Sequence, residues 1–149
     1  MDCIFCKIAK GEAPSRKLYE DEEFMVILDI GGAFFINSNE PIPGRMLAIP
    51  KRHVVRYHDL EDEEAAKLFV LSKKAASIIK ESYKPKFVDL IIRGGRVDHV
   101  HIILQPEFGE DDPHNLMFRL MESLFKLLPD EFLDKTYGQL KEKFKGLKI

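Results

Sequence analysis

Hydrophobic and polar positions follow two periods along the chain, and the shorter period marks the predicted strands. Short runs that are rich in β-branched and aromatic side chains and bounded by turn residues are typical of β-strands. The acidic turn Glu20–Glu23 divides the first such run into two short strands. The strand-like runs cover residues 16–28, 31–37, 45–50, 86–92 and 97–104.

The longer period, which is typical of helices, is clearest over residues 60–82. Asp59 is the predicted N-cap, acidic residues fill the first turn and lysines follow, an order that complements the helix dipole. Two more helices are predicted at 114–128 and 130–145, and a short helical turn ends at Gly11. Apolar residues recur at helical spacing along the long helix at Leu68, Leu71, Ala75, Ile78 and Ile79.

The connection between residues 86–92 and 97–104 reads "RGGR" and predicts a tight hairpin, because glycine supplies the positive φ angles that such turns need. Hairpin-joined strands with separate helices are typical of an α+β fold with an antiparallel sheet. We expect residues 1–112 to form this fold, with one long helix. Residues 113–149 are expected to form a helical C-terminal extension packed on the same domain.

The bulk composition favours one globular domain in a reducing compartment. The chain has 149 residues, of which 45% are hydrophobic and 32% are charged. Its formal net charge of −2 gives no electrostatic reason to expect nucleic acid as a partner. No apolar run is long enough to cross a membrane, and the N-terminus does not have the pattern of a signal peptide. Two cysteines are too few for a disulfide framework, so we expect a cytoplasmic protein.

Cys3 and Cys6 form a C-x-x-C pair, the first candidate for metal chemistry. A tetrahedral zinc site needs two more ligands, which neutral imidazoles commonly supply. His53 directly follows a predicted strand, and His99 lies on the polar side of another. A redox pair, or two small buried side chains, would also explain the cysteines, so the residues alone leave the choice open.

His99 and His101 alternate with apolar residues in the last predicted strand, which places them on one face with Ile103 and Gln105. Imidazole is a competent nucleophile toward phosphorus, and a neighbouring arginine such as Arg96 suits phosphate oxygens. This pattern favours a catalytic role on an anionic substrate. A structural, hydrogen-bonded pair of histidines is the alternative.

Three motifs occur in this order along the chain: "DCIFCKI", "PIPGRMLAIPKRHV" and "HVHIILQP". Together they resemble the histidine triad (HIT) superfamily of nucleotide hydrolases and transferases, over about residues 3–108. The segment "AFFINSNEPIPGRMLAIPKRH" looks most like the branch of dinucleoside polyphosphate hydrolases. The resemblance implies an antiparallel sheet with helices, usually assembled as a two-fold homodimer.

The resemblance also implies roles for individual residues. His101 matches the histidine that attacks the α-phosphate of a nucleotide and forms a nucleotidyl-histidine, and Asn37 matches the position that binds the ribose. Zinc-containing members bind a structural ion through the C-x-x-C pair, the histidine after "IPK" and the first histidine of the triad. These positions fall here on Cys3, Cys6, His53 and His99.

The chain departs from the family pattern around the expected phosphate site. Ile103 stands where the third histidine is expected, and Gln105 is the nearest polar substitute on that face. The loop before the triad is shortened to "RGGR", in which Arg96 is a candidate nucleotide contact, and Arg45 replaces another histidine. The C-terminal helical tail matches no typical member.

Three functions are compatible with these features. The first is a nucleotide hydrolase or nucleotidyl transferase that acts through His101 on a dinucleoside polyphosphate or a nucleoside phosphoramidate. The second is a catalytically weakened, zinc-containing module that binds a nucleotide or another partner. The third is a structural role, in which a zinc knot stabilises the chain and the tail mediates assembly.

Overall fold

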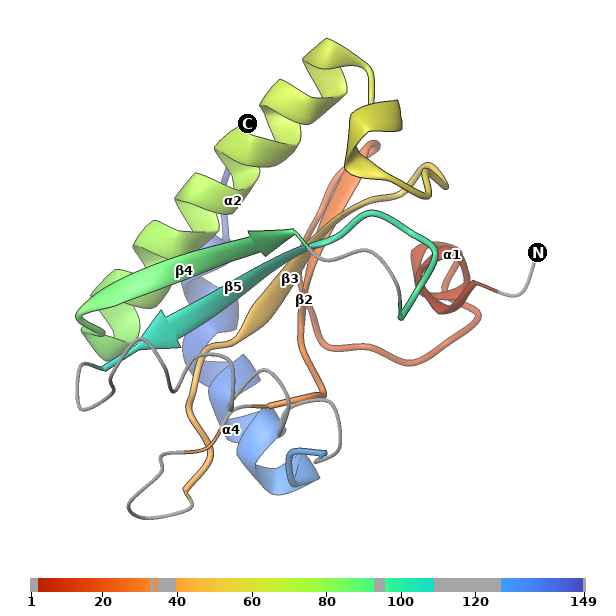
Figure 1. Cartoon of the computed structure of the whole chain (residues 1–149). Coiled ribbons are helices and arrows are strands. Elements are labelled where there is room, and N and C mark those ends of the chain that lie inside the picture. The colour runs from red at the N-terminus through yellow and green to blue at the C-terminus, as the bar shows by residue number, and fades with distance from the viewer. Residues whose placement is uncertain (1–2, 33, 35–39, 93–95, 109–126, 149) are drawn as a thin grey trace.

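Five antiparallel strands form one sheet in the order β1-β2-β3-β5-β4 (Figure 1). The strands are β1 (Lys17–Glu20), β2 (Phe24–Leu28), β3 (Met46–Pro50), β4 (Phe87–Ile92) and β5 (Ile102–Glu107). The sequence prediction of an α+β fold is therefore confirmed. The computed structural model describes residues 3–32, 34, 40–92, 96–108 and 127–148.

Helices cover both faces of this sheet, with the long helix on one face and the short N-terminal helix on the other (Figure 1). None of the described helices is both long and apolar enough to span a membrane. The helices among the described residues are α1 (Ile4–Ala9), α2 (Asp62–Tyr83) and α4 (Asp130–Lys141), with single 3-10 turns at Tyr57–Asp59 and Glu142–Phe144.

The alternation of side chains along β3 and β5 separates two apolar clusters. Ala48 and Leu104 pack with α2, whereas Leu47, Ile49 and Ile103 pack with α1 on the opposite face. Neighbouring strands keep this division because Leu47 lies opposite Ile103 in the ladder. The predicted assignment of alternate residues to opposite faces is confirmed.

The long helix begins later than the sequence predicts. Asp59 belongs to a 3-10 turn, and the N-cap is Glu61, which precedes the first helical residue, Asp62. Leu60 has an extended backbone and packs against the core, which interrupts the helical path between the two turns. The predicted N-cap is wrong for this reason, although the acidic first turn is confirmed.

The predicted tight hairpin between β4 and β5 is also wrong. Ile92 pairs with Ile102, so the connection spans residues 93–101, of which 93–95 lie outside the described residues. The backbone before β5 turns toward another loop instead of toward β4, and the N–H of Val100 donates to the carbonyl of Val54 at 2.7 Å. His99 and His101 therefore precede the strand.

The C-terminal helix α4 packs against α2 and β1, where Leu133 and Leu140 join the larger core cluster. The predicted helix at 114–128 falls almost entirely on residues outside the described part. At the predicted strand 31–37, the described residues Gly31 and Phe34 form isolated bridges rather than a ladder.

Candidate metal centre and adjoining cavity

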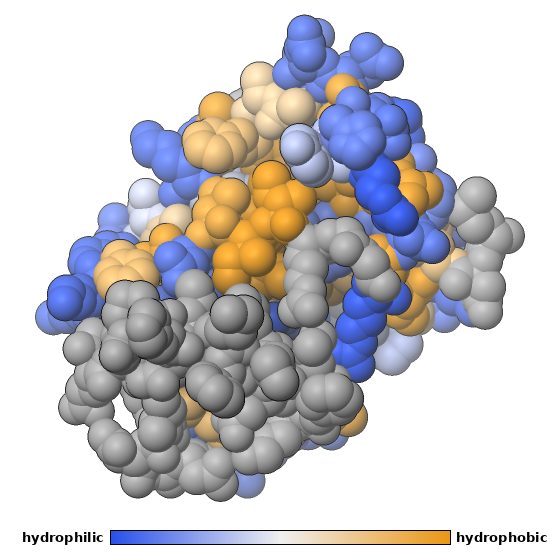
Figure 2. Space-filling view, in the orientation of Figure 1, coloured by the Kyte–Doolittle hydropathy of each residue, from blue (hydrophilic) through white to orange (hydrophobic). Residues whose placement is uncertain are grey.

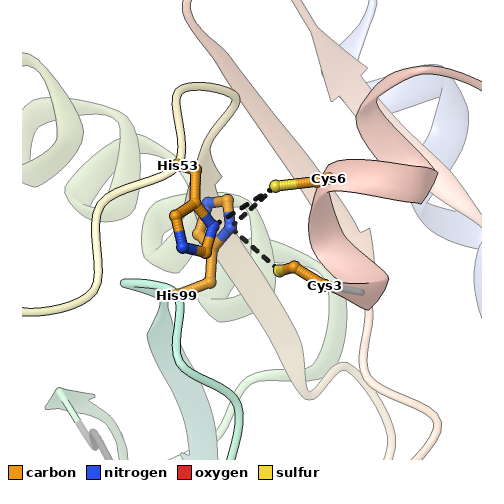
Figure 3. Close-up of side chains that lie close together, drawn as sticks. All are labelled: Cys3, Cys6, His53 and His99. Atoms are coloured by element: carbon orange, nitrogen blue, oxygen red, sulfur yellow. Dashed lines mark hydrogen bonds between the residues drawn. The ribbon is translucent and has the colours of Figure 1, made fainter. Parts of the chain in front are cut away.

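Cys3, Cys6, His53 and His99 meet in one cluster (Figure 3), and their candidate ligand atoms all lie within 4.8 Å of one another. The Nδ1 atom of His99 is 3.3 Å from the sulfur of Cys3 and 3.6 Å from that of Cys6. The Nδ1 atom of His53 is 3.3 Å from the sulfur of Cys6. The sequence named these four residues as one ligand set, and the structure brings them together.

The donor set fits a tetrahedral zinc ion. With zinc–sulfur and zinc–nitrogen bonds of normal length, a tetrahedral centre separates its sulfur and nitrogen ligands by about 3.6 Å. The sulfur–nitrogen distances of 3.3 Å and 3.6 Å in this cluster are close to that value. Four protein ligands would complete the coordination sphere, which is typical of a structural zinc site and leaves no position for substrate.

Hydrogen bonding and burial also prepare His99 to be a ligand. Its Nε2 atom donates to the carbonyl oxygen of Pro50 at 2.8 Å, which leaves Nδ1 without a proton and directed at the sulfurs. Burial lowers the pKa of His99, so the neutral imidazole that a metal requires is favoured. Burial raises the pKa of the Cys6 thiol, with further contributions from Cys3, so metal binding must release its proton.

Helix α1 links this cluster to the second histidine. Cys3 precedes the helix and Cys6 lies within it, so Phe5 between them is held close to the metal ligands. The ring of Phe5 lies 5.7 Å from that of His99 and 5.2 Å from that of His101, measured between centroids. A short helix that is anchored by the cluster therefore packs directly against both imidazoles.

His101 has a defined orientation. Its Nδ1 atom donates to the carbonyl oxygen of His99 at 2.8 Å, since a carbonyl can only accept. The neutral ring then carries its lone pair on Nε2, which takes part in no hydrogen bond among the described residues. This is the protonation state that a nucleophilic imidazole needs.

A cavity of about 1040 Å³ opens beside His101, on the face of the sheet that carries α1. Its apolar wall includes Phe5, Leu47 and Ile103. Charged side chains from five parts of the chain also line the cavity, at Arg16, Asp29, Arg45, Arg96, Asp130 and Asp134. A mostly apolar cavity with a few convergent polar groups is typical of a small-molecule site.

Two arginines of this cavity are already paired with carboxylates. Arg45 donates to Asp29 at 2.7 Å, and both side chains are largely buried. Arg16 donates to Asp134 at 2.7 Å and to Asp130 at 2.9 Å, and these hydrogen bonds raise the pKa of Arg16. The C-terminal helix α4 thereby closes one side of the cavity.

The three predicted nucleotide contacts have three different outcomes in the structure. Arg96 is exposed and lines the cavity. Gln105 is only 1% exposed and is not among the described lining residues. Asn37 lies outside the described residues. All three assignments stay predictions.

The sequence analysis missed two cavity residues with strong interactions, Asp29 and Arg16. A signal for Asp29 exists, because it is an acidic residue directly after an apolar strand. No comparable signal marks Arg16, whose partners Asp130 and Asp134 lie more than 110 positions further along the chain, at separations of 114 and 118.

Comparison with known proteins finds relatives that match most of the chain. A family model described as "Scavenger mRNA decapping enzyme C-term binding" matches residues 2–107. Protein hit of Bacillus subtilis is 33% identical over 116 residues, which cover 74% of this chain and 74% of the relative. An adenosine 5'-monophosphoramidase of Schizosaccharomyces pombe is 35% identical over 116 residues, which cover 74% of this chain and 78% of the relative.

Solved structures agree with these sequence matches. A zinc-bound histidine triad family protein from Mycobacterium smegmatis aligns with a TM-score of 0.72 and 28% identity, and the match covers 97% of this chain and 94% of the other. A hypothetical histidine triad nucleotide-binding protein from Sulfolobus tokodaii gives a TM-score of 0.76 and 25% identity, with 98% and 94% covered. Together with the family model, these relatives show that the chain belongs to the histidine triad family.

Proposed function

We propose that this protein is a nucleotide hydrolase or nucleotidyl transferase in which Nε2 of His101 attacks the α-phosphate of a nucleotide held in the cavity. One observation carries the proposal. Nδ1 of His101 donates a hydrogen bond to the carbonyl oxygen of His99, and the residue lines the cavity with its lone pair on Nε2. This tautomer leaves Nε2 available for nucleophilic attack on phosphorus.

The reaction divides into two displacements at phosphorus. A bond forms between Nε2 and the α-phosphorus while the bond to the leaving group breaks, and the leaving group departs with the bonding electron pair. Water then displaces the nucleotide from the histidine in hydrolysis, and another acceptor does so in transfer. Phe5 packs against the ring and limits its rotation during both steps.

The charges of the cavity favour a substrate with a single phosphate group. Arg16 and Arg45 are neutralised by carboxylates, and among the described lining residues Arg96 is the arginine without an ion pair. A dinucleoside polyphosphate would bring several negative charges into this lining. We therefore infer that a nucleoside phosphoramidate is preferred, in agreement with the name of the relative from Schizosaccharomyces pombe.

Zinc has a structural role in this proposal. Cys3, Cys6, His53 and His99 would hold the ion with four ligands, and it would supply folding free energy rather than a reactive water. The cluster fixes α1, and through Phe5 it fixes the ring of His101.

The test compares wild type with His101→Ala on an adenosine phosphoramidate and on diadenosine tri- and tetraphosphate. Chromatography measures the released monophosphate. We expect His101→Ala to lower the rate about a thousandfold or more while the circular dichroism spectrum is unchanged. His58→Ala is the matched control, since that side chain is 65% exposed in a 3-10 turn and is not a lining residue of the cavity.

A comparable rate in His101→Ala would overturn the proposed nucleophile. No release by folded, zinc-loaded wild type, together with measurable binding of AMP, would favour the second function, a nucleotide-binding module whose chemistry has been weakened at Ile103. Faster release from the diadenosine polyphosphates than from the phosphoramidate would reverse the proposed substrate preference.

We also propose a homodimer formed along β4. This strand is at one end of the described sheet, and Figure 2 shows apolar side chains gathered over it and beside α2. The exposed apolar residues of these two elements include Phe69 and Val70 in α2 and Phe87 and Ile92 in β4. An antiparallel pairing of two β4 strands would satisfy the open edge by two-fold symmetry. Sedimentation should show a dimer that Ile92→Glu converts to a monomer, and a monomeric wild type would contradict the pairing.

A further inference from the structure

Arg45 is a buried arginine on the wall of the cavity. It directly precedes β3, and its side chain is only 7% exposed although it carries a formal charge. It lines the cavity with Leu47, which lies two positions further along the same face. Burying a guanidinium is costly unless its donors find partners, so each of its nitrogens needs an explanation.

The Nε atom of the Arg45 guanidinium is held by a hydrogen bond, whereas its Nη1 atom has no hydrogen-bond partner among the described residues. Nε donates to Oδ2 of Asp29 at 2.7 Å, while Oδ1 of Asp29 accepts the N–H of Gly31 at 3.0 Å. Asp29 is thereby held from both sides and orients Arg45. Among the described residues, Nη1 of Arg45 is buried and has no hydrogen-bond partner.

The backbone at Arg45 is fixed from the opposite face of the sheet. Gly44 has a φ angle of +87°, and a Cβ atom added there would lie 2.8 Å from the ring of Tyr83 in α2. Only glycine fits this close approach, which determines the direction in which the chain enters β3. The unsatisfied Nη1 atom therefore belongs to a side chain whose position is set from both faces.

Arg45 is also a neighbour of the position where the third triad histidine is missing. Leu47 lies opposite Ile103 in the ladder, so Arg45 is on the diagonal from Ile103 on the same face. Diagonal neighbours on adjacent strands are close enough for a long side chain to reach across. Ile103 and His101 line the same cavity.

We propose that Arg45 binds the phosphate oxygens of the nucleotide and takes over the contact that isoleucine at position 103 cannot make. This inference rests on the proposed function, because it requires the nucleotide to occupy the cavity. An arginine whose Nε edge is held by a carboxylate presents its terminal nitrogens as a fork that matches phosphate. Asp29 is then a positioning residue, which acts through Arg45.

The first experiment measures binding of AMP and of adenosine by calorimetry. Arg45→Gln should weaken AMP binding about 10- to 100-fold and leave adenosine binding unchanged, since adenosine has no phosphate. Arg45→Lys should recover only part of the loss, because an ammonium lacks the fork. Arg45→Gln leaves Asp29 without its partner, so the double variant Asp29→Asn/Arg45→Gln provides a version with no unpaired charge.

The second experiment is a double-mutant cycle of Arg45→Gln and Ile103→His on the hydrolysis of an adenosine phosphoramidate. If Arg45 replaces the missing imidazole, restoring histidine at position 103 should reduce the loss in kcat/KM caused by Arg45→Gln at least tenfold. Purely structural damage by Arg45→Gln would be carried over unchanged into the Ile103→His background.

The outcomes separate this inference from the proposed function. Equal AMP affinities of wild type and Arg45→Gln, with both binding AMP more tightly than adenosine, overturn the role of Arg45 and leave the nucleotide site in place. Additive losses in the cycle overturn the replacement of the third histidine. A wild type that binds neither AMP nor adenosine overturns the proposed function itself.

Discussion

The metal cluster and the cavity lie on the same face of the sheet, but they differ in whether their polar atoms have partners. In the cluster, each sulfur or Nδ1 atom is close to another ligand atom, and the outer nitrogen of His99 is bound to Pro50. Among the residues that line the cavity, Arg45 has a buried Nη1 atom without a hydrogen-bond partner, and Nε2 of His101 takes part in no hydrogen bond among the described residues.

The contrast supports the proposal that the cluster stabilises the protein and that the cavity binds a ligand. The four ligand atoms of the cluster would fill every coordination position of a tetrahedral ion, and such a filled coordination sphere is typical of a structural metal site. Buried donors without partners cost free energy that a ligand can recover. The distribution of unsatisfied atoms therefore supports the proposal that His99 has a structural role and His101 a chemical one, although only two positions separate them.

The largest expected effect tests the structural side of this contrast. Removal of metal with a strong chelator, or the substitution Cys3→Ser, should lower the free energy of unfolding by about 5 kcal/mol or more, because the unfolded chain has no assembled site and the metal-binding free energy therefore stabilises only the folded state. Thermal unfolding followed by circular dichroism, with metal content measured on the same samples, provides the test.

His58→Ala is the control for that experiment, since His58 is exposed and lies outside the cluster. It should change neither metal content nor stability. An unchanged melting temperature after confirmed loss of the metal would show that the cluster does not contribute to stability, and the contrast between the two regions would then disappear.

An intermediate effect tests the backbone that positions Arg45. Gly44→Ala should destabilise the protein by about 2–4 kcal/mol, because alanine is unfavourable at this positive φ angle and its Cβ would meet Tyr83. Chemical denaturation measures the change. Gly138→Ala is a matched control in α4, where no atom lies within 4 Å of the added Cβ.

The control substitution should have the opposite sign. An alanine in the interior of a helix is expected to stabilise by about 0.5–1 kcal/mol relative to glycine. If Gly44→Ala proved neutral or stabilising, the strand entry before Arg45 would be adaptable, and the argument that its direction is fixed from α2 would fail.

The smallest expected effect is electrostatic and concerns Asp89 in β4, opposite Gln105. Burial raises the pKa of Asp89 above its ordinary value of 3.8. The folded state therefore favours the protonated form of Asp89. The contribution of this protonation to the free energy of unfolding is complete below pH 3.8 and is lost as the pH rises through the folded pKa.

Asp89→Asn replaces the ionisable carboxyl with a neutral amide, so the variant does not lose this stability as the pH rises. The variant should melt about 1–2 °C higher than wild type near pH 7, and the difference should shrink toward pH 4. Melting curves recorded across that range measure it. A difference that does not vary with pH would have to arise from packing rather than from ionisation.

Local sequence patterns predict those parts of the fold that local physics determines. The apolar, strand-forming runs at residues 45–50 and 86–92 predicted β3 and β4, because such runs are a local signal that needs no tertiary information. The four proposed metal ligands, which the structure brings together, followed from a resemblance in motifs, which carries tertiary information that composition lacks.

The errors arise where distant contacts override a local pattern. Residues 97–101 alternate like a strand, but Val100 bonds to Val54 and the His99 ring turns toward the cysteines, so the strand begins only at Ile102. Asp29 and Arg45 are 16 positions apart, and no periodic signal links a residue after one strand to a residue before the next.

The metal cluster has a consequence for the topology of the chain. Its ligand contacts join positions separated by 47, 93 and 96 residues, so an ion bound there would act as a cross-link that ties the N-terminus to the loop before β5. Without that link, α1 is a six-residue helix that is too short to be stable alone. Limited proteolysis should then cut first near α1, and the pattern of fragments would report the metal content of the sample.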